Sequence, residues 1–109
     1  MKTVILGILL SLAFSSVGYC LNADDVIGAA RKYAQSYGAG INLDKYKDPK
    51  AVFVAQEDVW IVHFVHKGEN PFPDSDFMVK IDKAGLPIAL LGGQYKQQYY
   101  QYFKDWYKS

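Results

Sequence analysis

Residues 58–87 read DVWIVHFVHKGENPFPDSDFMVKIDKAGLP, and this stretch decides the fold. Residues 59–66 and 77–82 are rich in β-branched and aromatic side chains, which favour strands. A short loop over residues 82–85 ends in Gly85, and glycine readily adopts the left-handed backbone of a type I turn with a bulge. We therefore expect two strands joined by a long connection, and then a hairpin into a third strand over residues 86–91.

The two faces of these strands indicate how deeply each strand is buried, because side chains alternate along a strand. In the first strand one face carries Trp60, Val62 and Phe64, and the other carries Val59, Ile61, His63 and Val65. Both faces are largely apolar, which predicts a central strand covered on both sides. Of the two faces of residues 77–82, one is more polar than the other, which predicts a half-buried strand. Pro87 lacks a backbone donor, which places the strand 86–91 at an edge or the proline at its first pair.

The flanking segments complete an α+β fold. Residues 22–37 predict a helix that Asn22 caps, with an apolar stripe made of Val26, Ala30, Tyr33 and Tyr37. Residues 51–56 predict one more strand. Helical spacing in residues 94–109 places on one face Tyr95, Tyr99, Tyr102, Phe103 and Trp106, and leaves off it Tyr100 and Tyr107. We expect an N-terminal helix packed on an antiparallel sheet of about four strands, plus a C-terminal aromatic helix.

The first 20 residues predict a secretory signal peptide. Lys2 supplies a positive charge, residues 4–14 form an apolar run too short to span a bilayer, and small residues follow. Cleavage is expected after Gly18 or after Cys20, which leaves residues 21–109 as one domain. The protein is therefore expected to be exported, either periplasmic or secreted. Cys20 is the only cysteine, and lipid attachment through it is the alternative.

Charge and cysteine content argue against a nucleic-acid-binding domain and against a domain stabilised by disulfides. After Lys2 the chain carries 11 basic and 11 acidic residues, whereas a nucleic-acid-binding domain would show a basic face. A single cysteine at the export boundary leaves the domain without an internal disulfide. The core must therefore stabilise the domain unaided.

Few residues suit catalysis or metal binding. His63 and His66 are three apart on a predicted strand, so they point to opposite faces and cannot together hold one metal. We interpret His63 as a packed, hydrogen-bonded core residue, with a general base in a pocket shared with Asp82 as the alternative. Asp74 and Asp76, two residues apart, could form a carboxylate pair, but separated loop carboxylates are more typically solvated. We expect no catalytic residue, no metal and no cofactor.

The order of one helix and four strands is that of cystatin-like or nuclear-transport-factor-like cone folds. Within it, Trp60-x-Val62-x-Phe64 and then Val79-x-Ile81-Asp82-x-x-Gly85-x-Pro87-Ile88 resemble two families. One comprises the small immunity proteins that neutralise toxins of polymorphic toxin systems, and the other the PepSY domains, exported modules linked to protease inhibition. The resemblance covers about residues 23–91 and does not include the tyrosine-rich tail. It implies a partner protein of the toxin or protease class.

Two segments are candidate binding surfaces. In the loop 67–75, Phe72 is flanked by two prolines and is either an exposed anchor or a plug at the end of the sheet. The tail either covers the second face of the sheet, binds a partner protein, or lies on a membrane surface. The candidate partner-binding residues are Glu69, Phe72, Asp74, Tyr100 and Tyr107.

The function that follows is a non-catalytic exported module that binds or inhibits another protein, of immunity-like type. The alternatives are a small-ligand-binding or enzymatic cone-fold protein, and a membrane-associated envelope component.

Overall fold

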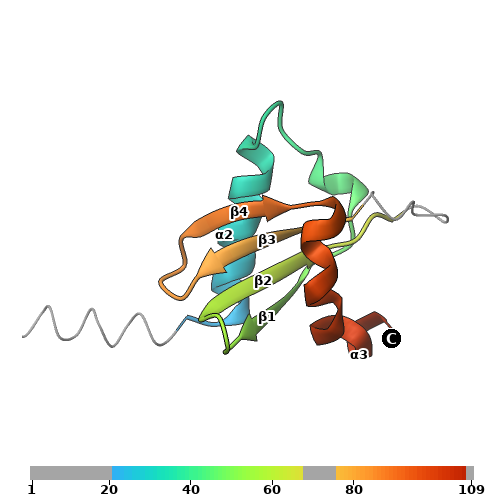
Figure 1. Ribbon diagram of the computed structural model, residues 1–109. Coiled ribbons are helices and arrows are strands. Elements are labelled where there is room, and N and C mark those ends of the chain that lie inside the picture. Colours follow the sequence, from blue (N-terminus) through green and yellow to red (C-terminus); the bar gives the residue numbers. More distant parts are fainter. Residues whose placement is uncertain (1–20, 68–75, 108–109) are drawn as a thin grey trace, which may run out of the picture.

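The computed structural model describes residues 21–67 and 76–107 (Figure 1). The predicted signal peptide with Cys20 lies outside these residues, and so do Glu69, Phe72 and Asp74. The described chain contains helix α2 (Ala23–Ser36), the 3-10 turn η1 (Leu43–Lys45), and strands β1 (Lys50–Val54), β2 (Val59–Phe64), β3 (Phe77–Asp82) and β4 (Pro87–Leu91). A long 3-10 helix η2 (Gly93–Phe103) and a short helix α3 (Lys104–Tyr107) follow, and we call η2 and α3 together the tail. The expected α+β fold class is confirmed.

The four strands form one antiparallel meander in the order β1-β2-β3-β4. The β3–β4 turn has the expected geometry, because Gly85 has φ of 92° and its N–H donates to the Asp82 carbonyl over 2.9 Å. Asp82 Oδ1 also accepts from the backbone N–H groups of Ala84 and Leu86, each at 2.9 Å. Pro87 begins β4, which is an edge strand of the described sheet, as its missing donor predicts.

Helix α2 begins where the sequence predicts. Asn22 Oδ1 accepts from the Asp25 N–H, and the Asp25 carboxylate accepts from the Asn22 N–H, which makes a capping box. Val26, Ala30 and Ala34 are buried against the sheet, while Tyr33 is half-buried and Tyr37 is exposed. The buried stripe is therefore narrower and made of smaller residues than expected, which lets the helix approach the strands closely.

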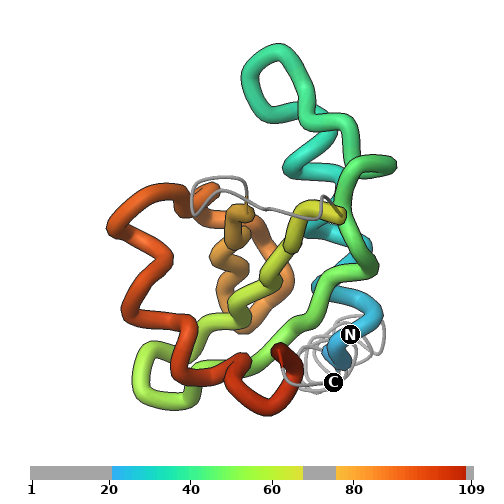
Figure 2. Tube along the Cα trace, turned by 90° about the vertical axis from the view of Figure 1, so that its right-hand side faces the viewer, coloured from blue at the N-terminus to red at the C-terminus, as the bar shows by residue number. Residues whose placement is uncertain are grey.

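The sheet divides the core into two clusters, as Figure 2 shows with the strands between α2 and the tail. On the α2 side lie Val62, Phe64, Phe77, Val79 and Ile81. On the tail side lie Val54, Val59, Ile61, Met78, Tyr99 and Phe103. The prediction that β2 is covered on both faces is confirmed. The prediction that β3 is half-buried is wrong, because the tail covers Met78 on its second face.

The tail covers the sheet, as one of its three interpretations predicted, but it is not the regular α-helix that the aromatic spacing suggested. Residues 93–103 form a 3-10 helix with about three residues per turn. Lys96, Tyr99 and Phe103 are the buried residues, and Tyr95 is 66% exposed. The tighter winding thus changes which side chains face the sheet, so the expected place for Tyr95 is wrong. Tyr99 donates to Glu57 Oε1 at 2.7 Å, which joins the tail to the β1–β2 turn.

Trp60 was expected on a covered face but is only half-buried. It lies near the end of the sheet where β2 begins, and pairs across strands with Phe53, which is also partly exposed. The two rings meet edge to face with centroids 5.4 Å apart.

Candidate functional site

Five polar side chains meet between the sheet and the tail, and we call them the Asp76 cluster. His63 comes from the tail side of β2, and Asp76 immediately precedes β3. Lys96 and Tyr100 come from η2, and Tyr107 comes from α3. The local fold brings them together, because His63 pairs with Met78, and Asp76 lies two residues before Met78 on the same side of the chain.

His63 lies at the centre of the cluster and is 1% exposed. Its Nε2 lies 2.5 Å from Asp76 Oδ2, and its Nδ1 lies 2.7 Å from the Tyr107 hydroxyl. A neutral ring protonated on Nε2 satisfies both contacts, since it donates to the carboxylate and accepts from the phenol. Four aromatic rings of the tail surround the imidazole edge to face: Tyr100, Phe103, Trp106 and Tyr107.

Asp76 accepts hydrogen bonds from three side chains. Besides His63, Tyr100 donates to Oδ2 at 2.8 Å, and the Lys96 ammonium contacts Oδ1 and donates to the Asp76 carbonyl at 2.9 Å. Burial alone would raise the pKa of the Asp76 carboxyl. The bonds from His63, Lys96 and Tyr100 and the Lys96 charge outweigh burial and lower this pKa to about 2. The carboxylate is therefore ionised across the neutral range and compensates a lysine that is 2% exposed.

In a buried Asp–His pair the carboxylate can orient the imidazole as a general base. In this protein, however, the pair is not accessible to a substrate. Both ring nitrogens of His63 are engaged, and in the described part of the chain no buried side-chain polar atom lacks a hydrogen-bond partner. Burial, followed by the nearby Asp76 charge, raises the pKa of Tyr107, so its hydroxyl stays protonated. A substrate would have to displace Tyr107 to reach His63. The arrangement fastens the tail to the sheet.

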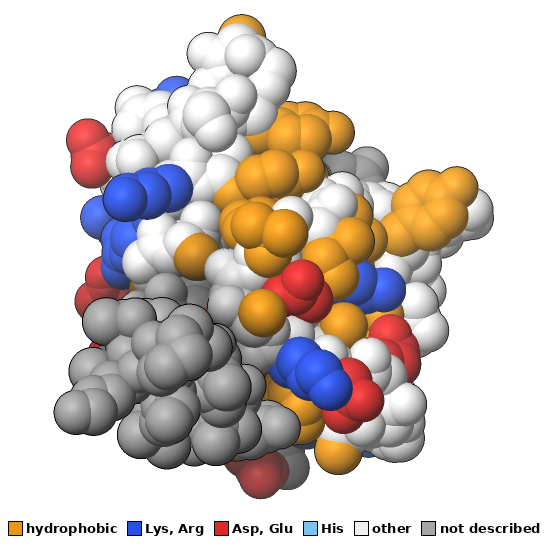
Figure 3. Space-filling model, turned by 90° about the vertical axis from the view of Figure 1, so that its left-hand side faces the viewer, with side chains coloured by type: hydrophobic (Ala, Val, Ile, Leu, Met, Phe, Trp, Pro, Cys, Tyr) orange, Lys and Arg blue, Asp and Glu red, His pale blue; other side chains and the backbone are white. Residues whose placement is uncertain are grey.

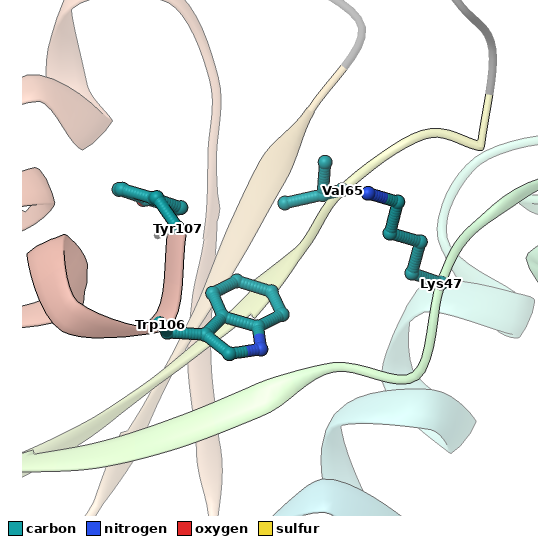
Figure 4. Close-up of a pocket in the computed structure, with 4 residues that line it drawn as sticks. All are labelled: Lys47, Val65, Trp106 and Tyr107. Carbon is teal, nitrogen blue, oxygen red and sulfur yellow. The ribbon is translucent and has the colours of Figure 1, made fainter. Parts of the chain in front are cut away.

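A hollow lies on the outer side of Tyr107 and Trp106 (Figure 4). Its volume is about 300 Å³, and among the described residues Lys47 and Val65 also line it. Trp106 and Tyr107 reach it from α3, and the other two side chains come from the segments that precede β1 and follow β2. It therefore combines aromatic surfaces with one cation.

The structure places the predicted candidates as follows. His63 is the packed, hydrogen-bonded core residue that the sequence predicted, and His66 points to the opposite face, where its ring meets Tyr46. Asp82 caps the β3–β4 turn and pairs with Val59 at the far end of β2, so it shares no pocket with His63. Glu69, Phe72 and Asp74 stay predictions because they lie outside the described residues.

The tail residues needed correction. Tyr100 and Tyr107 were expected off the buried face, but both hydroxyls reach into the Asp76 cluster, Tyr100 from the 3-10 helix η2 and Tyr107 from α3. Their rings remain partly accessible, and their part in binding a partner stays a prediction. Lys96 was not among the candidate residues, and Asp76 was grouped with Asp74 as a solvated loop pair. Strand alternation counted back from Met78 was the signal that could have placed Asp76 on the same side as His63.

Comparison with protein-family models, curated proteins and solved structures finds no match for this chain. Among residues 21–67 and 76–107, no three His, Cys, Asp or Glu side chains gather where they could bind a metal ion. No helix in the described ranges combines the length and the apolar character needed to cross a membrane.

Proposed function

We propose that this chain is a non-catalytic exported module that binds or inhibits another protein. The observation that carries the proposal is an exposed apolar surface at the edge strand β4. Leu86 is 65% and Ile88 51% exposed, on either side of Pro87. Figure 3 views the molecule from the side of the β3–β4 hairpin and shows hydrophobic side chains gathered there. Clustered apolar side chains on a protein surface are typical of interaction sites.

The edge of β4 favours contact through side chains over addition of a strand. Pro87 has no N–H to offer a partner strand. The register between β3 and β4 shifts, so that Lys80 pairs with Ala89 and Ile81 with Pro87, which leaves Ile88 in a bulge. Bulges and prolines are the usual protection of an edge against unwanted strand pairing. We therefore expect Ile88 to act as an apolar anchor in a pocket of the partner.

The closed Asp76 cluster supports the non-catalytic part of the proposal. The best acid–base pair among the described residues is used to fasten the tail, and the tail fills the sheet face where a cone-fold enzyme would hold its substrate. The export part rests on the sequence of residues 1–20. The partner class, a toxin or a protease, rests on the resemblance of about residues 23–91 alone.

A photo-crosslinking experiment in the source organism tests the proposal. A benzoylphenylalanine at position 88 should capture one defined partner, whereas the same group at Lys32, an exposed position on α2, should not. The captured protein is then purified, and its affinity for this chain is measured directly. Ile88→Asp should weaken binding at least about tenfold, which is about 1.4 kcal/mol, and Lys32→Asp should leave it unchanged.

Both substitutions lie at exposed positions, so neither should shift the melting temperature by more than a few degrees. Equal crosslinking from positions 88 and 32, or an affinity that Ile88→Asp leaves intact, would overturn the proposed surface.

A further inference from the structure

The segments that flank β1 and β2 extend the sheet beyond its named strands. Tyr46 and His66 form an antiparallel bridge, in which Lys47 N–H donates to the Val65 carbonyl at 2.8 Å and Lys67 N–H donates to the Lys45 carbonyl at 2.9 Å. The rings of Tyr46 and His66 turn toward the α2 side. Lys47 and Val65 therefore face the other side and meet α3, where the 300 Å³ hollow lies.

Positive charge concentrates at this ladder. Lys45, Lys47 and Lys67 are all exposed, and none of them takes part in an ion pair among the described residues. Lys45 lies directly opposite Lys67, an arrangement of like charges that destabilises a strand pair. Asp48, the nearest acidic residue after Lys47 in the sequence, pairs with Arg31 at 3.4 Å. A bound anion would relieve this repulsion.

The lining of the hollow defines the rest of the ligand. The indole of Trp106 and the ring of Tyr107 give it an aromatic wall, and Val65 adds an apolar one. The Tyr107 hydroxyl is already bound to His63, so the ring and not the hydroxyl is offered to a ligand. A volume of about 300 Å³ is at the lower end of ligand sites, large enough for one aromatic ring with a short polar group.

We propose that this pocket binds a small carboxylate with an aromatic body, with Lys47 pairing with the carboxylate and the Trp106 indole contacting the ring. Among the described residues that line the pocket, Lys47 is the one lysine, and it matches a single negative charge. This chemistry has two sources, a free aromatic acid or the C-terminal aromatic residue of a peptide. The pocket lies beside α3, not on β4, so the proposal does not rest on the protein-binding surface described above.

The two tryptophans of the chain make a direct assay available. In a Trp60→Phe background the only indole is that of Trp106, and its fluorescence reports binding. N-acetylphenylalanine should give a saturable change, and its uncharged amide should bind at least about tenfold more weakly. Lys47→Met should weaken the acid to a similar degree, whereas Lys83→Met, at the remote β3–β4 turn, should not.

Two further probes identify the source. The affinity of phenylacetate is compared with that of a pentapeptide that ends in phenylalanine. Equal affinities indicate that the natural ligand is a free acid. A higher affinity for the peptide, which falls when its C-terminus is amidated, indicates recognition of a chain end. The proposal is overturned if acid and amide titrate alike, if Lys47→Met leaves the acid unaffected, or if no saturation occurs up to about 10 mM, well above a millimolar Kd. The acid–amide comparison needs no substitution in the pocket, so it stands even where Lys47→Met proves unstable.

Discussion

Replacing Asp76 by asparagine tests what holds the tail on the sheet. The substitution keeps the size of the side chain and removes its charge. It removes the carboxylate that pairs with Lys96, which is 2% exposed, and weakens the bonds from His63 and Tyr100. Removing one partner of a buried ion pair costs about 3–5 kcal/mol, because the other charge stays desolvated. We expect a loss of unfolding free energy of that size at pH 7.

Part of this loss should depend on pH. The folded-state pKa of Asp76 is about 2, against an ordinary value of 3.8, and this difference corresponds to about 2 kcal/mol of stability from the ionised carboxylate. Because the folded pKa is the lower one, the contribution is fully present above about pH 4. It declines as pH falls from there toward 2.

Urea unfolding followed by circular dichroism, at pH 7, 5, 4, 3 and 2.5, measures the difference between the parent and Asp76→Asn. That difference should be constant down to about pH 4 and then shrink. The double variant Asp76→Asn/Lys96→Met should be more stable than Asp76→Asn alone, because it removes the buried charge as well.

Two results would refute this reasoning. One is a stability difference that stays constant from pH 7 to pH 2.5, since it would show that ionisation of Asp76 contributes nothing. The other is a double variant less stable than Asp76→Asn, since the lysine would then be stabilising without its partner.

The remaining predictions concern the core, the helix cap and the N-terminus. Phe103→Ala should lower the free energy of unfolding by about 3–5 kcal/mol, which is more than Trp60→Ala should, because Phe103 is fully buried and Trp60 is not. Equal losses in urea unfolding would contradict this order. Asn22→Ala should cost about 1 kcal/mol by breaking the capping box, and an unchanged melting temperature would argue against it. If Cys20 is lipidated, Cys20→Ser should release a folded protein from membranes, whereas soluble parent protein that lacks residues 1–18 or 1–20 would exclude the anchor.

Much of the fold could be predicted from local sequence. The cap at Asn22, the strand over residues 77–82, the Gly85 turn and the edge position of Pro87 each follow from backbone chemistry that neighbouring residues determine. Even the burial of His63 followed from its apolar neighbours on β2. These features need no knowledge of distant parts of the chain.

The Asp76 cluster could not be predicted in this way, because it depends on how the tail is wound. An α-helical spacing of the aromatic residues faces Tyr95 inward and Tyr100 outward, whereas the 3-10 helix buries Lys96 and turns Tyr100 toward Asp76. Contacts with distant parts of the chain hold this segment, among them the bond of Tyr99 to Glu57 across 42 residues. Intrinsic helix propensity is a weak guide where such contacts decide.

The sheet separates two hydrophobic clusters that share strands but no helix. Such a core offers a route for opening in parts: the tail could detach while α2, Val62 and Phe64 remain packed. Amide hydrogen exchange would then distinguish the tail from the rest of the molecule. The amides of η2 would exchange through a smaller opening than those of β2 and α2, and the free energy of that opening would measure how firmly the tail is held on the sheet.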